Sequence, residues 1–237
     1  MTTEWQGDAG RPFRRFLSKV PEITAYFWIV RILISVVAGA VRDTRDLTLT
    51  TAGAIVALLI ALAVQLRAQR YVPARYWLVM LLAGVVATLL VDTAVENLEI
   101  PPAITALGLA LALAGTGAAW YRRERSLSLH TIDTPQREGF YWLAVLLAFA
   151  LGAAVVPYAA VGALTGGILL VIGLVLRSVL VFWVAFVATG PVGGALGELV
   201  NPPLAAAVAL GVITAVVAYL TVSHTDAPIR PLRMAQR

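Results

Sequence analysis

Three acidic residues of this chain stand at one fixed distance from a tryptophan, a pattern that could bring carboxylates together around a cation or a proton. Each lies fifteen residues after an aromatic–Trp pair, and the three are Asp43, Asp92 and Glu198. Only 13 of the 237 residues are acidic, so composition alone does not predict the shared spacing. Oxygen ligands suit H⁺, Mg²⁺, Ca²⁺ or Mn²⁺, and acidic rings select cations in pores. The alternative is that these acids are wetted helix ends at the bilayer edge, where a charge costs less than at the centre.

The same segments carry other residues that could act on a solute. We expect the four tryptophans to form an aromatic belt at the inner membrane interface, with packing around an axis as the alternative; they are Trp28, Trp77, Trp142 and Trp183. Arg31 follows Trp28 by three residues, so we expect its side chain to snorkel to the cytoplasmic headgroups. The alternative for Arg31 is an inward role, as a gate or as counter-ion to a carboxylate.

The stretch "TGPVGGALGE" predicts an interruption in the last of these segments. A helix kinked or broken there would expose backbone carbonyls beside Glu198, as discontinuous transporter helices do. The residues of the expected break are Gly190, Pro191, Gly193 and Gly194.

The inventory of reactive residues argues against an enzyme. The chain has no cysteine, which excludes disulfides, thiolate metal sites and cysteine nucleophiles. Zinc-protease, Ser-His-Asp and phosphate-loop motifs are also absent from the sequence. We therefore expect no catalytic residues and no cofactor, and a metal site, if there is one, would use oxygen ligands or the two histidines.

Composition assigns the chain to the membrane. It is 60% hydrophobic and 13% charged, with a mean hydropathy of +0.86. Eight apolar stretches have about the 20 residues needed to cross a bilayer, and they predict an all-α integral membrane protein. Their approximate limits are 22–41, 47–66, 76–97, 101–121, 139–156, 161–176, 179–200 and 203–221.

The basic residues predict the orientation. Of 18 Lys and Arg residues, all but Arg31, Arg42 and Arg45 fall on one side of the eight-helix arrangement. The positive-inside rule then places both termini in the cytoplasm. Because these residues flank helices and form no single stripe, we do not expect nucleic-acid binding despite a pI near 10.0. Arginine greatly outnumbers lysine, which indicates a GC-rich bacterial genome, so we expect the bacterial plasma (inner) membrane.

The odd-numbered stretches align with one another as an internal repeat. Each starts with an aromatic–Trp pair, in "YFWIVRILISVVAGAVRD", "RYWLVMLLAGVVATLLVD", "FYWLAVLLAFALGAAVVP" and "VFWVAFVATGPVGGALGE". The unit is a two-helix hairpin, and an even number of crossings makes the four copies parallel. We predict a cytoplasmic tail over 1–20, a membrane domain over 21–222 and a second tail over 223–237. The repeats cover about 21–67, 73–121, 137–177 and 179–222.

Three segments, "KVPEITAYFWIVRIL", "RYVPARYWL" and "ERSLSLHTIDTPQREGFYWL", together with the Trp-bearing hairpin, resemble an uncharacterised bacterial family of polytopic "membrane-anchored" proteins built from a four-fold repeat of unknown function. The resemblance runs from about residue 19 to 221. It implies an acid where this chain has Gly39 and another where it has Pro157, and it implies no biochemical activity.

These observations favour a small transporter or channel for a cation or a small solute, with the three acids at the outer entrance. The alternative is a non-transporting scaffold or sensor that acts through the loop 122–138 and the tails. The partners we expect are the lipid bilayer and the solute, with homo-oligomerisation left open.

Overall fold

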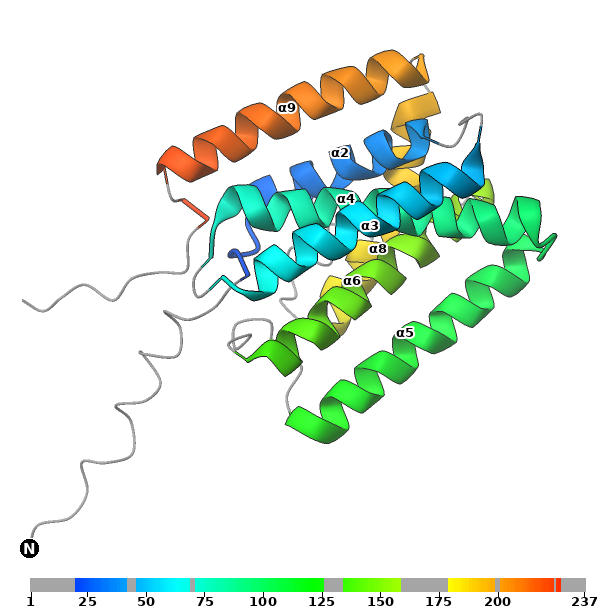
Figure 1. Ribbon diagram of the computed structural model, residues 1–237, viewed down its shortest axis with the longest axis horizontal. Helices are drawn as coiled ribbons and strands as arrows, with labels where there is room; N and C mark the ends of the chain where they lie inside the picture. Colours follow the sequence, from blue (N-terminus) through cyan, green and yellow to red (C-terminus); the bar gives the residue numbers. More distant parts are fainter. Residues whose placement is uncertain are drawn as a thin grey trace, which may run out of the picture.

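The structure, a computed structural model, describes residues 20–41, 46–68, 71–125, 134–158, 179–198, 201–223 and 225–226. These residues form seven α-helices, with a π-helical turn, η1 (Thr93–Asn97), after α4 and a 3-10 turn, η3 (Val156–Tyr158), after α6 (Figure 1). The helices are α2 (Ala25–Ala40), α3 (Leu47–Leu66), α4 (Pro73–Asp92), α5 (Pro102–Glu124), α6 (Pro135–Ala154), α8 (Val179–Glu198) and α9 (Pro202–Ser223).

Five of these helices are long and apolar enough to cross a membrane, by length and composition, and α2 and α8 are shorter apolar helices. The chain is therefore an all-helical, multi-pass membrane protein. Seven of the expected spans correspond to described helices, whereas the expected span 161–176 lies outside the described residues. Helices α4, α5 and α6 each have a proline in their first turn, because the N–H that proline lacks has no helical partner at that position.

Four helices form an inner ring, and the others cover it. Helix α2 packs on α4, α4 on α6, α6 on α8, and α8 back on α2. The outer helices are largely exposed on the surface: only 11% of the membrane-spanning window of α3 is buried and 6% of that of α5, against 56% for α4 and 61% for α6. Apolar side chains cover the exposed faces of the outer helices, as contact with lipid requires.

The outer helices follow one rule of placement. Helix α3 packs on α4 and α5 packs on α6, so each lies against the inner helix that comes next in the chain. Helix α9, the last, packs on α2, the first inner helix. In Figure 1, α9 and α5 accordingly lie on opposite sides of the inner helices.

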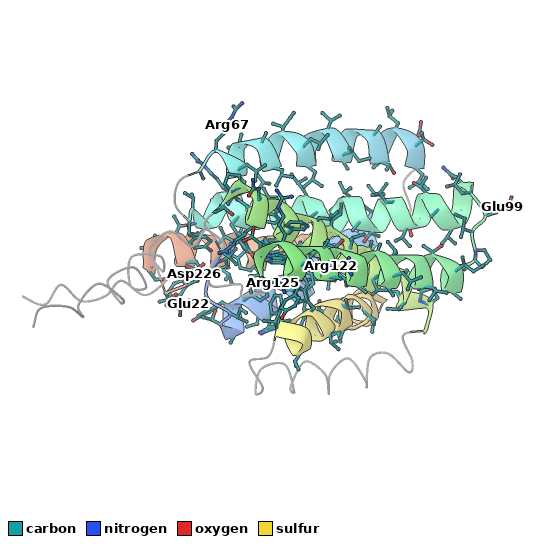
Figure 2. All side chains as sticks on the ribbon, turned by 90° about the horizontal axis from the view of Figure 1, so that it is seen from below. Glu22, Arg67, Glu99, Arg122, Arg125 and Asp226 are labelled. Atoms are coloured by element: carbon teal, nitrogen blue, oxygen red, sulfur yellow. The ribbon has the colours of Figure 1, made fainter. Side chains whose placement is uncertain are left out.

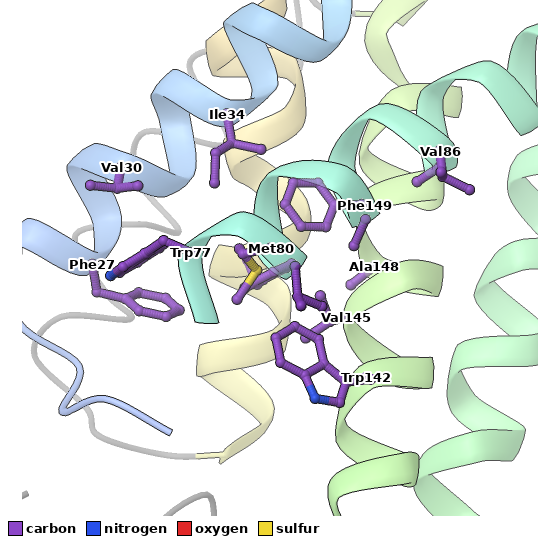
Figure 3. Close-up of a cluster of buried hydrophobic side chains, with 14 of the residues drawn as sticks. Phe27, Val30, Ile34, Trp77, Met80, Val86, Trp142, Val145, Ala148 and Phe149 are labelled. Carbon is purple, nitrogen blue, oxygen red and sulfur yellow. The ribbon is translucent and has the colours of Figure 1, made fainter. Parts of the chain in front are cut away.

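The core fills the space between α2, α4 and α6 with apolar and aromatic side chains, among them Ile34, Met80, Val145 and Phe149 (Figure 3). Gly84 of α4 lies where a Cβ would come within 2.7 Å of Ile34 and 2.9 Å of Phe149. The absence of a side chain at Gly84 thus lets α2 and α6 place large side chains against α4.

At the end where the inner helices begin, short polar contacts join separate segments. The Asp226 backbone oxygen accepts a hydrogen bond from the Glu22 N–H at 3.1 Å, and its carboxylate accepts one from the Tyr71 hydroxyl. Burial raises the pKa of Tyr71, and hydrogen bonding to Asp226 raises it further. Arg137 donates to Glu124 at 2.6 Å, which links α5 to α6. In Figure 2, Glu22 and Asp226 lie at this end of the molecule and Glu99 lies at the other.

Candidate functional site

An aromatic layer closes the inner ring where its helices begin. Each inner helix contributes an aromatic residue followed by a tryptophan, and the four pairs are Phe27–Trp28, Tyr76–Trp77, Tyr141–Trp142 and Phe182–Trp183. The first ring of each pair contacts the tryptophan of the next inner helix around the ring. The centroid distances are 5.7 Å for Phe27–Trp77, 5.4 Å for Tyr76–Trp142, 6.3 Å for Tyr141–Trp183 and 5.7 Å for Phe182–Trp28.

The expectation of an aromatic belt at the membrane surface is wrong for most of these tryptophans. Trp28, Trp77 and Trp142 are buried inside the helix bundle, and Trp183 is partly buried against it. Packing around the axis, the alternative, is what the structure shows. At the centre of the layer the hydroxyls of Tyr76 and Tyr141 form a buried hydrogen bond. Aromatic rings of the described residues therefore occupy the space between the four inner helices at this level.

Arg31 lies just beyond the aromatic layer and points inward. Its side chain is 0% exposed, so the expectation that it snorkels to the headgroups is wrong. Nη1 donates to Ser35 Oγ at 2.6 Å, and Nη2 donates to the Phe186 backbone oxygen at 3.1 Å. The guanidinium carbon lies 3.5 Å from the ring centroid of Phe149 and 4.1 Å from that of Phe186. The side chain thus extends toward Ser35, four residues further along α2, and away from the aromatic layer.

A pocket of about 90 Å³ lies between the inner helices beyond Arg31. Two of its wall residues, Ser35 and Phe149, also contact the guanidinium of Arg31. The other polar side chain in the wall is Thr88 of α4, and the rest of the wall is small or apolar. Its remaining lining residues are Val36, Ala38, Gly39, Ala40, Ala153, Val156, Gly190, Gly193, Gly194, Gly197 and Pro202.

The glycines of α8 shape this pocket by close helix contact. A Cβ on Gly190 would lie 2.7 Å from the Gly152 backbone of α6, and a Cβ on Gly193 would lie 2.9 Å from the Ile32 oxygen of α2. Helix backbones can approach this closely only where the residues between them are small, so glycines line the space between these helices. Gly39, by contrast, has no atom within 4 Å of an added Cβ, so this wall position faces open space.

The expected break in α8 is not present. The helix runs as one α-helix from Val179 to Glu198 with Pro191 inside it, and Gly190, Gly193 and Gly194 are all helical. Neighbouring helices accommodate a membrane proline without breaking its helix, and the Val187 oxygen, which Pro191 cannot bond, lies against Gly152. The glycines of this stretch therefore allow close helix packing and do not break the helix.

The structure describes only one of the three predicted acidic side chains. Asp43 lies outside the described residues, and for Glu198 only the backbone, at the end of α8, is described. Asp92 is buried at the end of α4, one turn beyond Thr88, and the π-helical turn η1 follows it directly. No group of three His, Asp or Glu side chains with metal-site geometry occurs within the described part of the chain. Convergence of the three acids stays a prediction.

Sequence reasoning missed most of the pocket wall. Ser35 and Thr88 are ordinary hydroxyl residues in apolar helices, and Phe149 and Phe186 read as core. One signal was available: Arg31, Ser35 and Gly39 stand four residues apart, and that spacing places them on one face of α2.

Comparison with known proteins adds no relative: no family model, curated protein or solved structure matches this chain. The resemblance to a four-fold repeat family stays a prediction.

Proposed function

We propose that the protein is a small membrane transporter that carries a small solute through the pocket between its four inner helices. The supporting observation is the pocket itself, which has lining residues from all four inner helices and shares two of them with the contacts of the buried Arg31. Solute sites in transporters lie near the middle of the membrane between packed helices, and ionisable groups inside a membrane mark such pathways.

The aromatic layer supports a carrier more than an open channel. A pocket near one end of the inner helices, with packed rings between the same helices at the other end, fits one state of an alternating-access cycle. In the other state the inner helices would separate at the aromatic layer. The small contact surfaces at Gly152 and Gly190 are suited to such sliding because no side chain interlocks there.

The test is solute flux in proteoliposomes, with a pocket-filling variant. Gly39→Leu adds a side chain into open pocket space, and Gly53→Leu, on the exposed face of α3, adds the same side chain outside the pocket. Osmotic re-swelling is followed with urea as the neutral probe and with potassium nitrate plus valinomycin as the anion probe. Uptake of radioactive rubidium is the cation probe.

We expect at least one probe to enter wild-type proteoliposomes faster than protein-free liposomes. Gly39→Leu should reduce that rate at least tenfold, and Gly53→Leu should leave it unchanged. Asp92→Asn tests whether the solute is a cation. If cation passage needs the Asp92 carboxylate, neutralising it should abolish rubidium uptake. Rates equal to those of protein-free liposomes for every probe would reject transport.

A sensor is the second candidate, and the sealed aromatic layer favours it, because a receptor needs a pocket but no through path. Solute binding without flux is its expected signature.

A further inference from the structure

The charge balance around Arg31 is the feature that the proposed function leaves unexplained. Arg31 is fully buried, and its described partners are all neutral: one hydroxyl, one backbone oxygen and two aromatic faces. Its Nε has no hydrogen-bond partner. Among the described residues, no carboxylate forms an ion pair with Arg31. The ion pair that these residues do form joins Arg137 to Glu124, away from Arg31.

A buried charge in a membrane protein is normally compensated. Burial of an unpaired ion costs several kcal/mol even after relaxation. Cation–π contacts with Phe149 and Phe186 recover about 2 kcal/mol or more when desolvated, and the two hydrogen bonds recover part of the rest. Neutral partners leave the unit charge in place, however, so the positive potential reaches the nearby pocket.

The pocket and the guanidinium of Arg31 share contact residues. Ser35 and Phe149 are shared between the pocket wall and the contacts of Arg31, and Ser35 and Thr88 place hydroxyl groups in that wall. We infer that the solute of this pocket is a small monovalent anion that balances the charge of Arg31. This inference rests on the proposed function for its transport role, but anion binding can be tested separately.

Size and polarity narrow the class of anion. A pocket of about 90 Å³ has room for a small anion such as chloride, nitrate or formate. The wall carries two hydroxyls among apolar and glycine surfaces, which is too little to replace the hydration shell of sulfate or phosphate. One buried arginine also balances one negative charge.

The dipoles of the inner helices disfavour an anion in the pocket, but their effect is weaker than that of the unit charge of Arg31. The inner helices end near the pocket, and a helix C-terminus disfavours an anion by roughly 0.3 to 1 kcal/mol, an effect confined to the last turn. Ser35 and Gly193 lie five residues before the ends of α2 and α8. Helix α9 begins at Pro202, a wall residue, and presents its positive end there. The full charge of Arg31 exceeds these partial charges. Asp92, a buried acid one turn beyond Thr88, carries a full opposing charge, but it does not line the pocket, whereas Arg31 contacts two of the lining residues.

The experiment measures the thermal unfolding midpoint of the purified full-length protein in detergent. Sodium nitrate is compared with sodium gluconate, a larger anion with many more polar groups to desolvate, at equal concentration, so that the cation and ionic strength stay constant. At a tenfold excess over the dissociation constant, nitrate should raise the midpoint by roughly 3 to 6 °C relative to gluconate. The rise should saturate with concentration.

Arg31→Met keeps the bulk of the side chain without the charge and should abolish the difference between nitrate and gluconate. Gly39→Leu, which fills the pocket and leaves Arg31 in place, should abolish it too, and Gly53→Leu should preserve it. If Arg31→Met does not fold, the midpoints of Gly39→Leu in nitrate and in gluconate decide whether the anion binds in the pocket. Equal midpoints in nitrate and gluconate for the wild type, or an unchanged difference in Gly39→Leu, overturns the inference.

The flux assay separates this inference from the proposed function. A nitrate-dependent midpoint without nitrate flux supports the anion site and rejects transport. Flux of urea or rubidium without a nitrate-dependent midpoint supports transport and rejects the anion.

Discussion

Two of the four axial aromatic positions carry a hydroxyl, and this difference has energetic consequences. Tyr76 and Tyr141 donate and accept within one buried pair, whereas the equivalent residues of α2 and α8 are Phe27 and Phe182. A buried hydroxyl whose partner is removed costs about 1 to 3 kcal/mol, but removal of both partners is nearly neutral. The pair therefore matters most when only one member is changed.

We expect Tyr76→Phe alone and Tyr141→Phe alone each to lower the free energy of unfolding. The double variant should cost less than the sum, with a coupling of about 0.6 to 1.7 kcal/mol, as for hydrogen bonds between membrane helices. Denaturant titration of the four proteins in one detergent measures the cycle. Strictly additive losses would mean that the two hydroxyls do not depend on each other.

At the scale of helices, hydropathy predicts the positions of the seven described helices, five of which are long and apolar enough to cross a membrane, because a stretch of about 20 apolar residues has few other structures available. It could not predict which face of each helix turns inward. A helix that is apolar all round has no polar face to orient it, so the positions of Arg31 and the tryptophans depended on packing between helices. The pocket could not be predicted from the sequence for the same reason, since its wall comes from five helices and η3.

The contact between α6 and α8 gives the prediction at this scale. A Cβ at Gly190 would meet the Gly152 backbone at 2.7 Å, and backbone cannot move aside as a flexible side chain can. Gly190→Ala should therefore lower the free energy of unfolding by about 1 to 3 kcal/mol. Gly108→Ala is the matched control, because Gly108 of α5 has no atom within 4 Å of an added Cβ.

The control variant should be as stable as the wild type or slightly more so, because alanine favours a helix over glycine by about 0.5 to 1 kcal/mol. Denaturant titration of both variants checks the pair. Equal stability of Gly190→Ala and Gly108→Ala would show that α6 and α8 separate easily.

The packing of the whole molecule is cyclic. The aromatic contacts run from each inner helix to the next and close from α8 to α2, and the outer helices follow the same order. A four-fold repeat of hairpins predicts a cyclic arrangement of this kind, and the expected helix 161–176 lies outside the described residues. The outer helices within the described residues are α3, α5 and α9.

The direction of the pocket depends on how this ring sits in the membrane. The inner helices end on the side of Glu99, and many of the pocket's lining residues lie near those ends, whereas Arg67 lies at the end with the aromatic layer. The distribution of basic residues predicts that Arg67 faces the cytoplasm. The anion site would then load from outside and be sealed toward the cytoplasm by the aromatic layer.

The absence of cysteine makes this orientation directly measurable, because a single introduced cysteine is the only thiol. Glu99 and Arg67 are both exposed. In intact cells, a membrane-impermeant maleimide should label Glu99→Cys at once and Arg67→Cys only after the membrane is permeabilised. The reverse pattern would place the aromatic layer outside, and the pocket would then take its solute from the cytoplasm. Labelling of both cysteines in intact cells would contradict a bundle that spans the membrane in one direction, since the two residues lie at opposite ends of the same helices.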